Sequence, residues 1–132
     1  MVFDNDFLDS LSRQAKASER LRQHYDLRNS ENDNSQRMLN ALEPGTIIKI
    51  HKHPLASTFT LVLRGKVVIH IYNNHGELGK DIVLSHNGNM ACTVSANEWH
   101  NLECLEPDTV IFEQKDIKYD SETDAVFFDF PI

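Results

Sequence analysis

From Gln36 onward the sequence is made of short runs rich in Val, Ile, Leu, Phe and Thr, separated by turn-forming residues such as Pro44-Gly45 and Asn87-Gly88. The pattern predicts eight strands, at residues 38–42, 46–53, 58–63, 66–72, 81–84, 90–94, 99–105 and 109–113. Strands at this spacing indicate an all-β antiparallel sandwich or barrel. This constrains the fold more than any other property of the chain.

The first 35 residues differ from the rest. Asp4 or Asn5 is placed to cap a helix. The helix would carry one apolar stripe, formed by Phe7, Leu8, Leu11, Ala15 and Leu21. Residues 22–35 are polar and rich in Asn, Ser and Asp, a composition typical of a surface connection. We therefore expect residues 1–35 to form a helix and connecting segment packed on a barrel of residues 36–132.

Composition narrows the possible partners. The chain has 132 residues, 40% of them hydrophobic, which fits one domain with a single core. Its 13 basic and 20 acidic side chains give a net charge of -7. This charge disfavours binding to nucleic acid and anionic membranes, so small molecules or proteins are the expected partners. No leader-like or membrane-spanning run is found, so we expect a cytoplasmic protein. Cys92 and Cys104 are expected to be thiols.

Three histidines suggest a metal site. His51 and His53 are two residues apart in a predicted strand and therefore project from one face, about 6 to 7 Å apart. If His100 joins them, three neutral imidazoles can bind zinc, nickel, iron or copper and leave a coordination position open. The alternative is a metal-free polar pocket in which the histidines bind a ligand by hydrogen bonds.

The same residues resemble the two cupin motifs. Gly45, His51, His53 and Gly65 stand at the spacing of the first motif. Ser95-Ala96-Asn97-Glu98-Trp99-His100 resembles the second, with His100 at the third histidine. The resemblance implies a cupin double-stranded β-helix, a jelly-roll barrel, with His51, His53 and His100 as metal ligands.

Several positions depart from the cupin motifs. Thr58 stands where the family has a metal-binding Glu, and Ser95 replaces the usual Pro. Asn97 replaces a Gly, which asparagine can do because it tolerates the left-handed conformation. Cys104 stands where the second motif ends in Asn. Without the Glu, the site lacks a hard anionic ligand and should favour zinc, nickel or copper over manganese, with Fe(II) still compatible.

A narrower resemblance is to WbuC-type cupin-fold metalloproteins, small bacterial proteins associated with surface-polysaccharide genes. It rests on 36–45, 51–54, 62–65, 99–100, 105–107, 112–116 and 119–120. Asp26-Leu27-Arg28 departs from the Asn, apolar residue and His that the family tends to have. The resemblance implies a divalent metal and a small ligand derived from a sugar, with Gln36, Lys115 and Tyr119 in the pocket.

Other residues are candidates for supporting roles, each with a structural alternative. Thr58 can hold a metal-bound water or be an ordinary strand threonine. Arg37 can anchor an anionic group or form a salt bridge, including one with Glu113. Glu113 is a candidate acid or base if it faces inward. Cys104 shares the strand parity of His100 and can face the cavity, although a small core side chain is the commoner role.

Trp99 has the opposite parity and should pack outside the pocket, whereas His24, His70, His75 and His86 have no partner at ligand spacing. Two functions remain open. One is an enzyme acting on a sugar or small polar substrate of surface-polysaccharide metabolism. The other is a non-catalytic sugar-binding cupin with a degenerate or metal-free site. Apolar strands at 59–63 and 66–72 suggest a homodimer.

Overall fold

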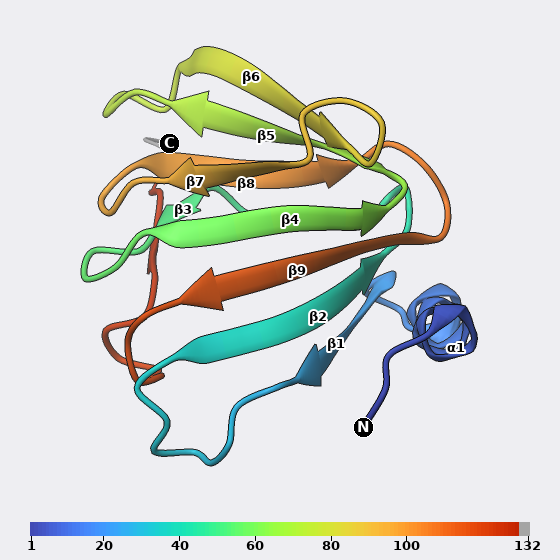
Figure 1. Cartoon of the computed structure of the whole chain (residues 1–132). Coiled ribbons are helices and arrows are strands. Elements are labelled where there is room, and N and C mark those ends of the chain that lie inside the picture. Colours follow the sequence, from blue (N-terminus) through green and yellow to red (C-terminus); the bar gives the residue numbers. More distant parts are fainter. Residues whose placement is uncertain (130–132) are drawn as a thin grey trace.

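The computed structural model describes residues 1–129 as two facing antiparallel sheets of five strands each, with one helix outside (Figure 1). The first sheet has the order β1 (Arg22–Asp26), β2 (Gln36–Leu42), β9 (Thr109–Lys115), β4 (Thr58–Arg64) and β7 (Ala91–Val94). The second has the order β10 (Val126–Phe127), β3 (His51–Lys52), β8 (Trp99–Cys104), β5 (Lys66–Tyr72) and β6 (Leu78–Ser85). The all-β prediction is confirmed.

The main core lies between the two sheets. Its largest buried side chains include Leu42, Ile69, Leu84 and Ile111, each no more than 2% exposed. Burying an aliphatic side chain of this size stabilises the fold by about 1.5 to 3 kcal/mol. Apolar packing between the two sheets therefore holds the barrel together.

Helix α1 (Asn5–Ala17) packs against the outer face of the first sheet. Asp4 caps it by accepting a hydrogen bond of 2.9 Å from the Phe7 amide. Leu8, Leu11 and Ala15 are buried in a second cluster that also contains side chains of β2 and β9. No helix among residues 1–129 is long and apolar enough to cross a membrane.

Leu21 does not extend the helical stripe, so this part of the helix prediction is wrong. The helix ends at Ala17 because Ser18 is extended, and Leu21 has a positive φ of 56°. The Leu21 amide and carbonyl instead bond to Ser18 and Glu43, and this turn leads the chain into β1.

The prediction that residues 22–35 form only a connection is wrong for its first part. Residues 22–26 form β1, which pairs with β2 from Arg22 opposite Leu42 to Asp26 opposite Met38. Tyr25 faces α1 and makes edge-on ring contacts with Phe3 and Phe7. The opposite face of β1 is polar because it lines a cavity rather than the core. Because of these polar residues, the sequence pattern did not predict the strand.

The predicted strand at 46–53 is also too long, since only His51–Lys52 is a strand. Side chains and a distant amide satisfy the carbonyls of the preceding residues. Arg22 donates to Ile47 O at 2.7 Å, Asn101 donates to Ile48 O at 3.2 Å, and the Phe128 amide donates to Ile50 O at 3.0 Å. These bonds hold the segment in place without a neighbouring strand.

His70 on β5 predicts a pH dependence of stability. Partial burial lowers its pKa, but hydrogen bonds to Asp81 (2.5 Å) and Glu103 (3.2 Å) prevail and raise the pKa above its usual value. A raised folded-state pKa stabilises the protein fully below the unfolded value of about 6.5, and this contribution is lost as pH rises through the folded value.

We therefore expect wild-type protein to lose up to about 1 kcal/mol of stability relative to His70→Ala as pH rises from about 6 to 8.5. Urea unfolding at several pH values measures this difference. His75→Ala, in an exposed turn, keeps His70 and is the control, so its stability should show the same pH dependence as that of wild type. A constant difference between wild type and His70→Ala would contradict the prediction.

Candidate metal site

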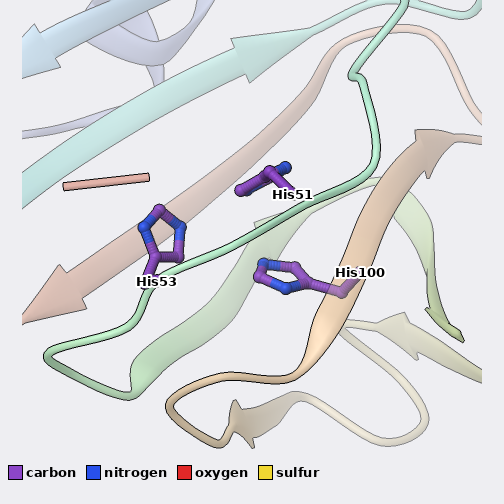
Figure 2. A group of neighbouring side chains, drawn as sticks. All are labelled: His51, His53 and His100. Carbon is purple, nitrogen blue, oxygen red and sulfur yellow. The ribbon is translucent and has the colours of Figure 1, made fainter. Parts of the chain in front are cut away.

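The structure brings His51, His53 and His100 together near one end of the barrel. His51 lies on β3 directly opposite His100 on β8, and His53 follows β3. Each ring offers one ligand nitrogen, and these three atoms all lie within 4.8 Å of one another. Figure 2 shows the three rings gathered around a common space. Strand pairing thus joins the two parts of the sequence that supply the histidines.

Each ring is held by a hydrogen bond through Nδ1. The acceptors are backbone oxygens: Lys49 O for His51 (2.7 Å), Asp124 O for His53 (2.8 Å) and Glu98 O for His100 (2.9 Å). Because a carbonyl oxygen only accepts, Nδ1 carries the proton in the neutral rings of His51 and His100. At His53 the 2.8 Å bond to Asp124 O favours the same tautomer, since the Lys115 ammonium, which only donates, is farther from Nδ1 at 3.4 Å. The Nε2 lone pair of each histidine is then available to a metal.

The environment also keeps the rings uncharged. Burial lowers the pKa of His51 and His53, with a further lowering from the positive charge of Lys115. Burial and the neighbouring His51 lower the pKa of His100 to about 4. Neutral imidazole is the form that binds transition metals. The donor set therefore fits a divalent transition metal.

The histidines line a cavity of about 220 Å³ together with Thr58, Glu113 and Lys115. Thr58 is 5% exposed, and its buried Oγ1 has no hydrogen-bond partner within residues 1–129. A buried hydroxyl without a partner is costly, so it suits a site that receives a polar ligand. Burial raises the pKa of Glu113, although Lys115 and a hydrogen bond from Asn40 oppose the rise.

Asp124 is a site residue that sequence reasoning missed. Its backbone oxygen holds His53, while its carboxylate accepts hydrogen bonds from Lys115 (3.0 and 3.1 Å) and Gln36 (3.1 Å). Burial alone would raise the pKa of Asp124, but these bonds lower it below its usual value. Asp124 lies in a turn far along the chain from His53. No sequence pattern links the two residues.

We expect Asp124→Asn to destabilise the protein by about 1 to 2 kcal/mol, because the Lys115 ammonium loses its charged partner in a mostly buried place. Chemical denaturation measures the loss. Glu122→Gln, an equal charge change on an exposed neighbour, should leave stability nearly unchanged. Equal stability of Asp124→Asn and wild type would show that the ion pair contributes nothing.

The loop before β8 is tied to the site. Asn97 has a φ of 66°, so the expectation that it adopts the left-handed conformation is confirmed. Its amide donates a hydrogen bond of 3.0 Å to His53 O, and Glu98 O holds His100. One tight turn thus contacts two of the three histidine-bearing segments.

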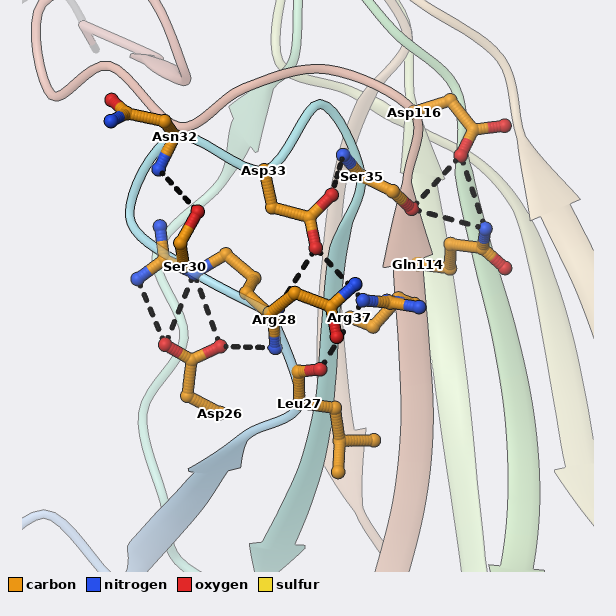
Figure 3. A network of polar contacts seen from close by, with 11 residues as sticks. Asp26, Leu27, Arg28, Ser30, Asn32, Asp33, Ser35, Arg37, Gln114 and Asp116 are labelled. Carbon is orange, nitrogen blue, oxygen red and sulfur yellow. Dashed lines mark hydrogen bonds and ion pairs between the residues drawn. The ribbon is translucent and has the colours of Figure 1, made fainter.

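A second cavity of about 630 Å³ adjoins the first, and the two share Arg22, Asn40 and Lys115. Gln36, Tyr119 and Arg37 line this second cavity rather than the one with the histidines. Figure 3 shows how Arg37 donates to Asp33 (2.8 Å) and Leu27 O (3.3 Å). Arg37 is therefore paired with Asp33 and not with Glu113, the partner considered from the sequence.

Two predicted residues lie away from the histidines. Cys104 faces the barrel interior as its parity suggested, but it is 4% exposed in the apolar core and lines neither cavity. The reason is its place at the far end of β8, four residues from His100 and thus about 13 Å along the strand. Trp99 packs edge-on against Phe128, with Lys52 Nζ 4.6 Å from its ring centroid.

Several solved structures share this fold. The capsular polysaccharide assembling protein CapF from Staphylococcus aureus matches with a TM-score of 0.70 at 19% identity, covering 85% of this chain and 33% of CapF. KdgF from Halomonas sp. matches with a TM-score of 0.60 at 15% identity, covering 76% and 82% of the two chains. Oxalate decarboxylase from Lactobacillus farciminis matches with a TM-score of 0.64 at 10% identity, covering 84% and 32%.

The chain thus spans about a third of CapF and of the oxalate decarboxylase. At these identities the matches show the fold alone, and the prediction of a cupin jelly roll is confirmed. No curated protein matches the sequence. A family model described as a domain of unknown function, DUF6016, matches residues 3–84. The chain belongs to the DUF6016 family, and its barrel has the cupin fold.

Proposed function

We propose that this protein is a cupin metalloprotein that binds one divalent transition metal through Nε2 of His51, His53 and His100. The observation that carries the proposal is the convergence of three ligand nitrogens within 4.8 Å, each on a ring fixed by a hydrogen bond to a backbone oxygen. Three neutral imidazoles without a carboxylate favour zinc, nickel or copper over manganese, and Fe(II) is compatible with them.

We further propose that the site is catalytic and acts on a sugar or small polar substrate of surface-polysaccharide metabolism. A bound metal would supply Lewis acidity, polarising a carbonyl or activating water. Thr58 Oγ1 is placed to bind a ligand oxygen, and Lys115, whose charge is paired with Asp124, lines the same cavity. Glu113 has a raised pKa and faces the cavity, so it is suited to hold and transfer a proton.

The choice of substrate class has two supports. The sequence resembles WbuC-type cupins, and a structural neighbour is described as a capsular polysaccharide assembling protein. The experiment is incubation of zinc-, nickel- or iron-loaded, tag-free protein with nucleotide sugars and sugar phosphates, followed by mass spectrometry. Turnover that is lost in Glu113→Gln and kept in His86→Ala supports the proposal. Equal turnover in wild type and Glu113→Gln would remove Glu113 from the mechanism.

A second candidate is a non-catalytic module that retains a sugar in the same cavity. Thr58 favours this alternative, because the position that carries a metal-binding Glu in the cupin motif offers only a hydroxyl here. Calorimetry separates the two functions. Binding of a sugar without any conversion, in both metal-loaded and chelator-treated protein, favours the module.

We also propose a homodimer. Phe59, Leu78 and Val83 are 39%, 57% and 42% exposed, and an interface across the sheets would cover such side chains. Light scattering coupled to size-exclusion chromatography gives the mass in solution. A monomer mass at high protein concentration would exclude a stable dimer.

A further inference from the structure

The second cavity is an extension of the first and not a separate surface feature. Its polar wall is the inward face of β1 and β2, which carries Arg22 and Asn40. Both residues also line the cavity with the histidines, as does Lys115. A ligand of roughly 630 Å³ or less can therefore lie over this face with one end beside the metal-binding rings.

Positive charge gathers in this cavity although the whole chain carries a net charge of -7. Four arginines line it: Arg20, Arg22, Arg28 and Arg37. Two of them are neutralised by the protein itself. Arg28 is in a two-pronged ion pair with Asp26, and Arg37 is paired with Asp33, as Figure 3 shows. Asp124 likewise neutralises Lys115.

Arg20 and Arg22 remain without a carboxylate partner within residues 1–129. Nη1 of Arg22 donates to Ile47 O at 2.7 Å and to Thr46 Oγ1 at 3.3 Å, which fixes the guanidinium in place. Its Nε and Nη2 make no hydrogen bond to the described part of the chain. Burial and the nearby Arg20 lower the pKa of Arg22, so the pair is a local excess of positive charge.

Arg37, which also lines this cavity, has one unpaired donor among the described residues. Arg37 Nε is buried and has no hydrogen-bond partner among residues 1–129. Buried donors are normally paired, and each one left unpaired costs about 1 to 3 kcal/mol. A doubly charged oxyanion can accept from several guanidinium groups at once and neutralise two of them, which a single carboxylate does less completely.

We propose that the second cavity binds the phosphate group of a phosphorylated sugar, with Arg20 and Arg22 as the anchoring cations. The sugar part of this assignment rests on the function proposed above, whereas the phosphate part rests on the arginines alone. The phosphate lies against β1, and the sugar extends past Arg22 and Asn40 toward His51, His53 and His100. Arg22 lines both cavities. It therefore favours a ligand whose negative charge lies as far from the histidines as Arg22 does.

The test is calorimetric titration of glucose 1-phosphate into tag-free protein treated with EDTA, so that phosphate bound to a metal does not contribute. Glucose and glucuronate are titrated in parallel. We expect glucose 1-phosphate to bind, glucose not to bind detectably, and glucuronate to bind about tenfold more weakly. Arg20→Gln and Arg22→Gln should each weaken glucose 1-phosphate binding by about tenfold.

Arg13→Gln is the matched control, since it removes the same charge from an exposed position of α1 outside the cavity. It should bind as wild type does. Arg20 is the safer of the two test sites because its side chain makes no hydrogen bond to residues 1–129, and thermal unfolding checks that Arg22→Gln is folded. Arg22→Lys keeps the charge without the planar fork and should bind between wild type and Arg22→Gln.

The inference is overturned if glucose 1-phosphate does not bind, if both Gln variants bind it as wild type does, or if glucuronate binds equally well. These outcomes are independent of the metal proposal. If phosphate binding depends on Arg20 and Arg22 but the protein takes up no metal, the phosphate site is supported and the proposed metal centre is wrong. Metal uptake without phosphate binding would do the reverse.

Discussion

Replacing His100 with alanine is expected to abolish stable metal binding by tag-free protein. The ring supplies one of three converging nitrogens, and two imidazoles alone leave a divalent ion mostly hydrated. The affinity should fall by more than the roughly 10- to 100-fold that loss of a ligand's hydrogen-bond partner causes. Zinc, nickel and iron contents, measured by mass spectrometry after dialysis against a weak chelator, report the change.

His86→Ala is the control for this variant, because His86 lies in an exposed turn away from the site. It should retain the metal content of wild type. Circular dichroism of both variants after EDTA treatment shows whether His100→Ala is folded. A folded His100→Ala protein with unchanged metal content would mean that the metal, if bound, is held elsewhere.

Gly65→Ala is expected to destabilise the protein by at least about 3 kcal/mol. Gly65 joins β4 to β5 with a φ of 84°, a conformation that side chains with a Cβ rarely adopt. An added Cβ would also lie 2.7 Å from Thr109 Cα and closer still to Thr109 Oγ1. Neither contact can relax cheaply, because Thr109 is fully buried and its hydroxyl bonds to Lys66 N and Glu106 O.

Thermal or urea unfolding measures the effect of Gly65→Ala, and Gly88→Ala is the matched control. At Gly88 the nearest atom to an added Cβ is the Ser85 hydroxyl, the end of a small side chain that can rotate. We expect a loss of less than about 1 kcal/mol there. Similar losses for the two variants would show that the approach of Thr109 does not constrain the turn.

The sequence pattern located most of the barrel because apolar strands and turn residues are local signals. It predicted β5 at its observed bounds and the left-handed turn at Asn97. It missed β1 and β10, two short edge strands; β10 has two residues and pairs with a two-residue partner, β3, that is far away in the sequence. The cavity-facing residues of β1 are polar, so alternation of apolar side chains cannot reveal that strand.

For the site, the spacing of the histidines in the sequence was informative. Contacts between residues far apart in the sequence could not be predicted from it. His51, His53 and His100 stood out because strand geometry brings residues two apart to one face. Strand parity did not locate Cys104 correctly. Parity predicts which face of the sheet a side chain is on, but not at which end of the barrel the residue lies. Asp124 and the pairing of Arg37 with Asp33 depend on how loops fold back, which residue spacing does not encode.

The return of residues 120–128 to the histidine end of the barrel has a consequence for the histidine cluster. Asp124 O fixes the His53 ring, and β10 pairs with β3 beside His51. None of the side chains of the apolar core between the sheets comes from this segment. A substitution within residues 120–128 can therefore disturb the histidine cluster while the core of the barrel stays intact.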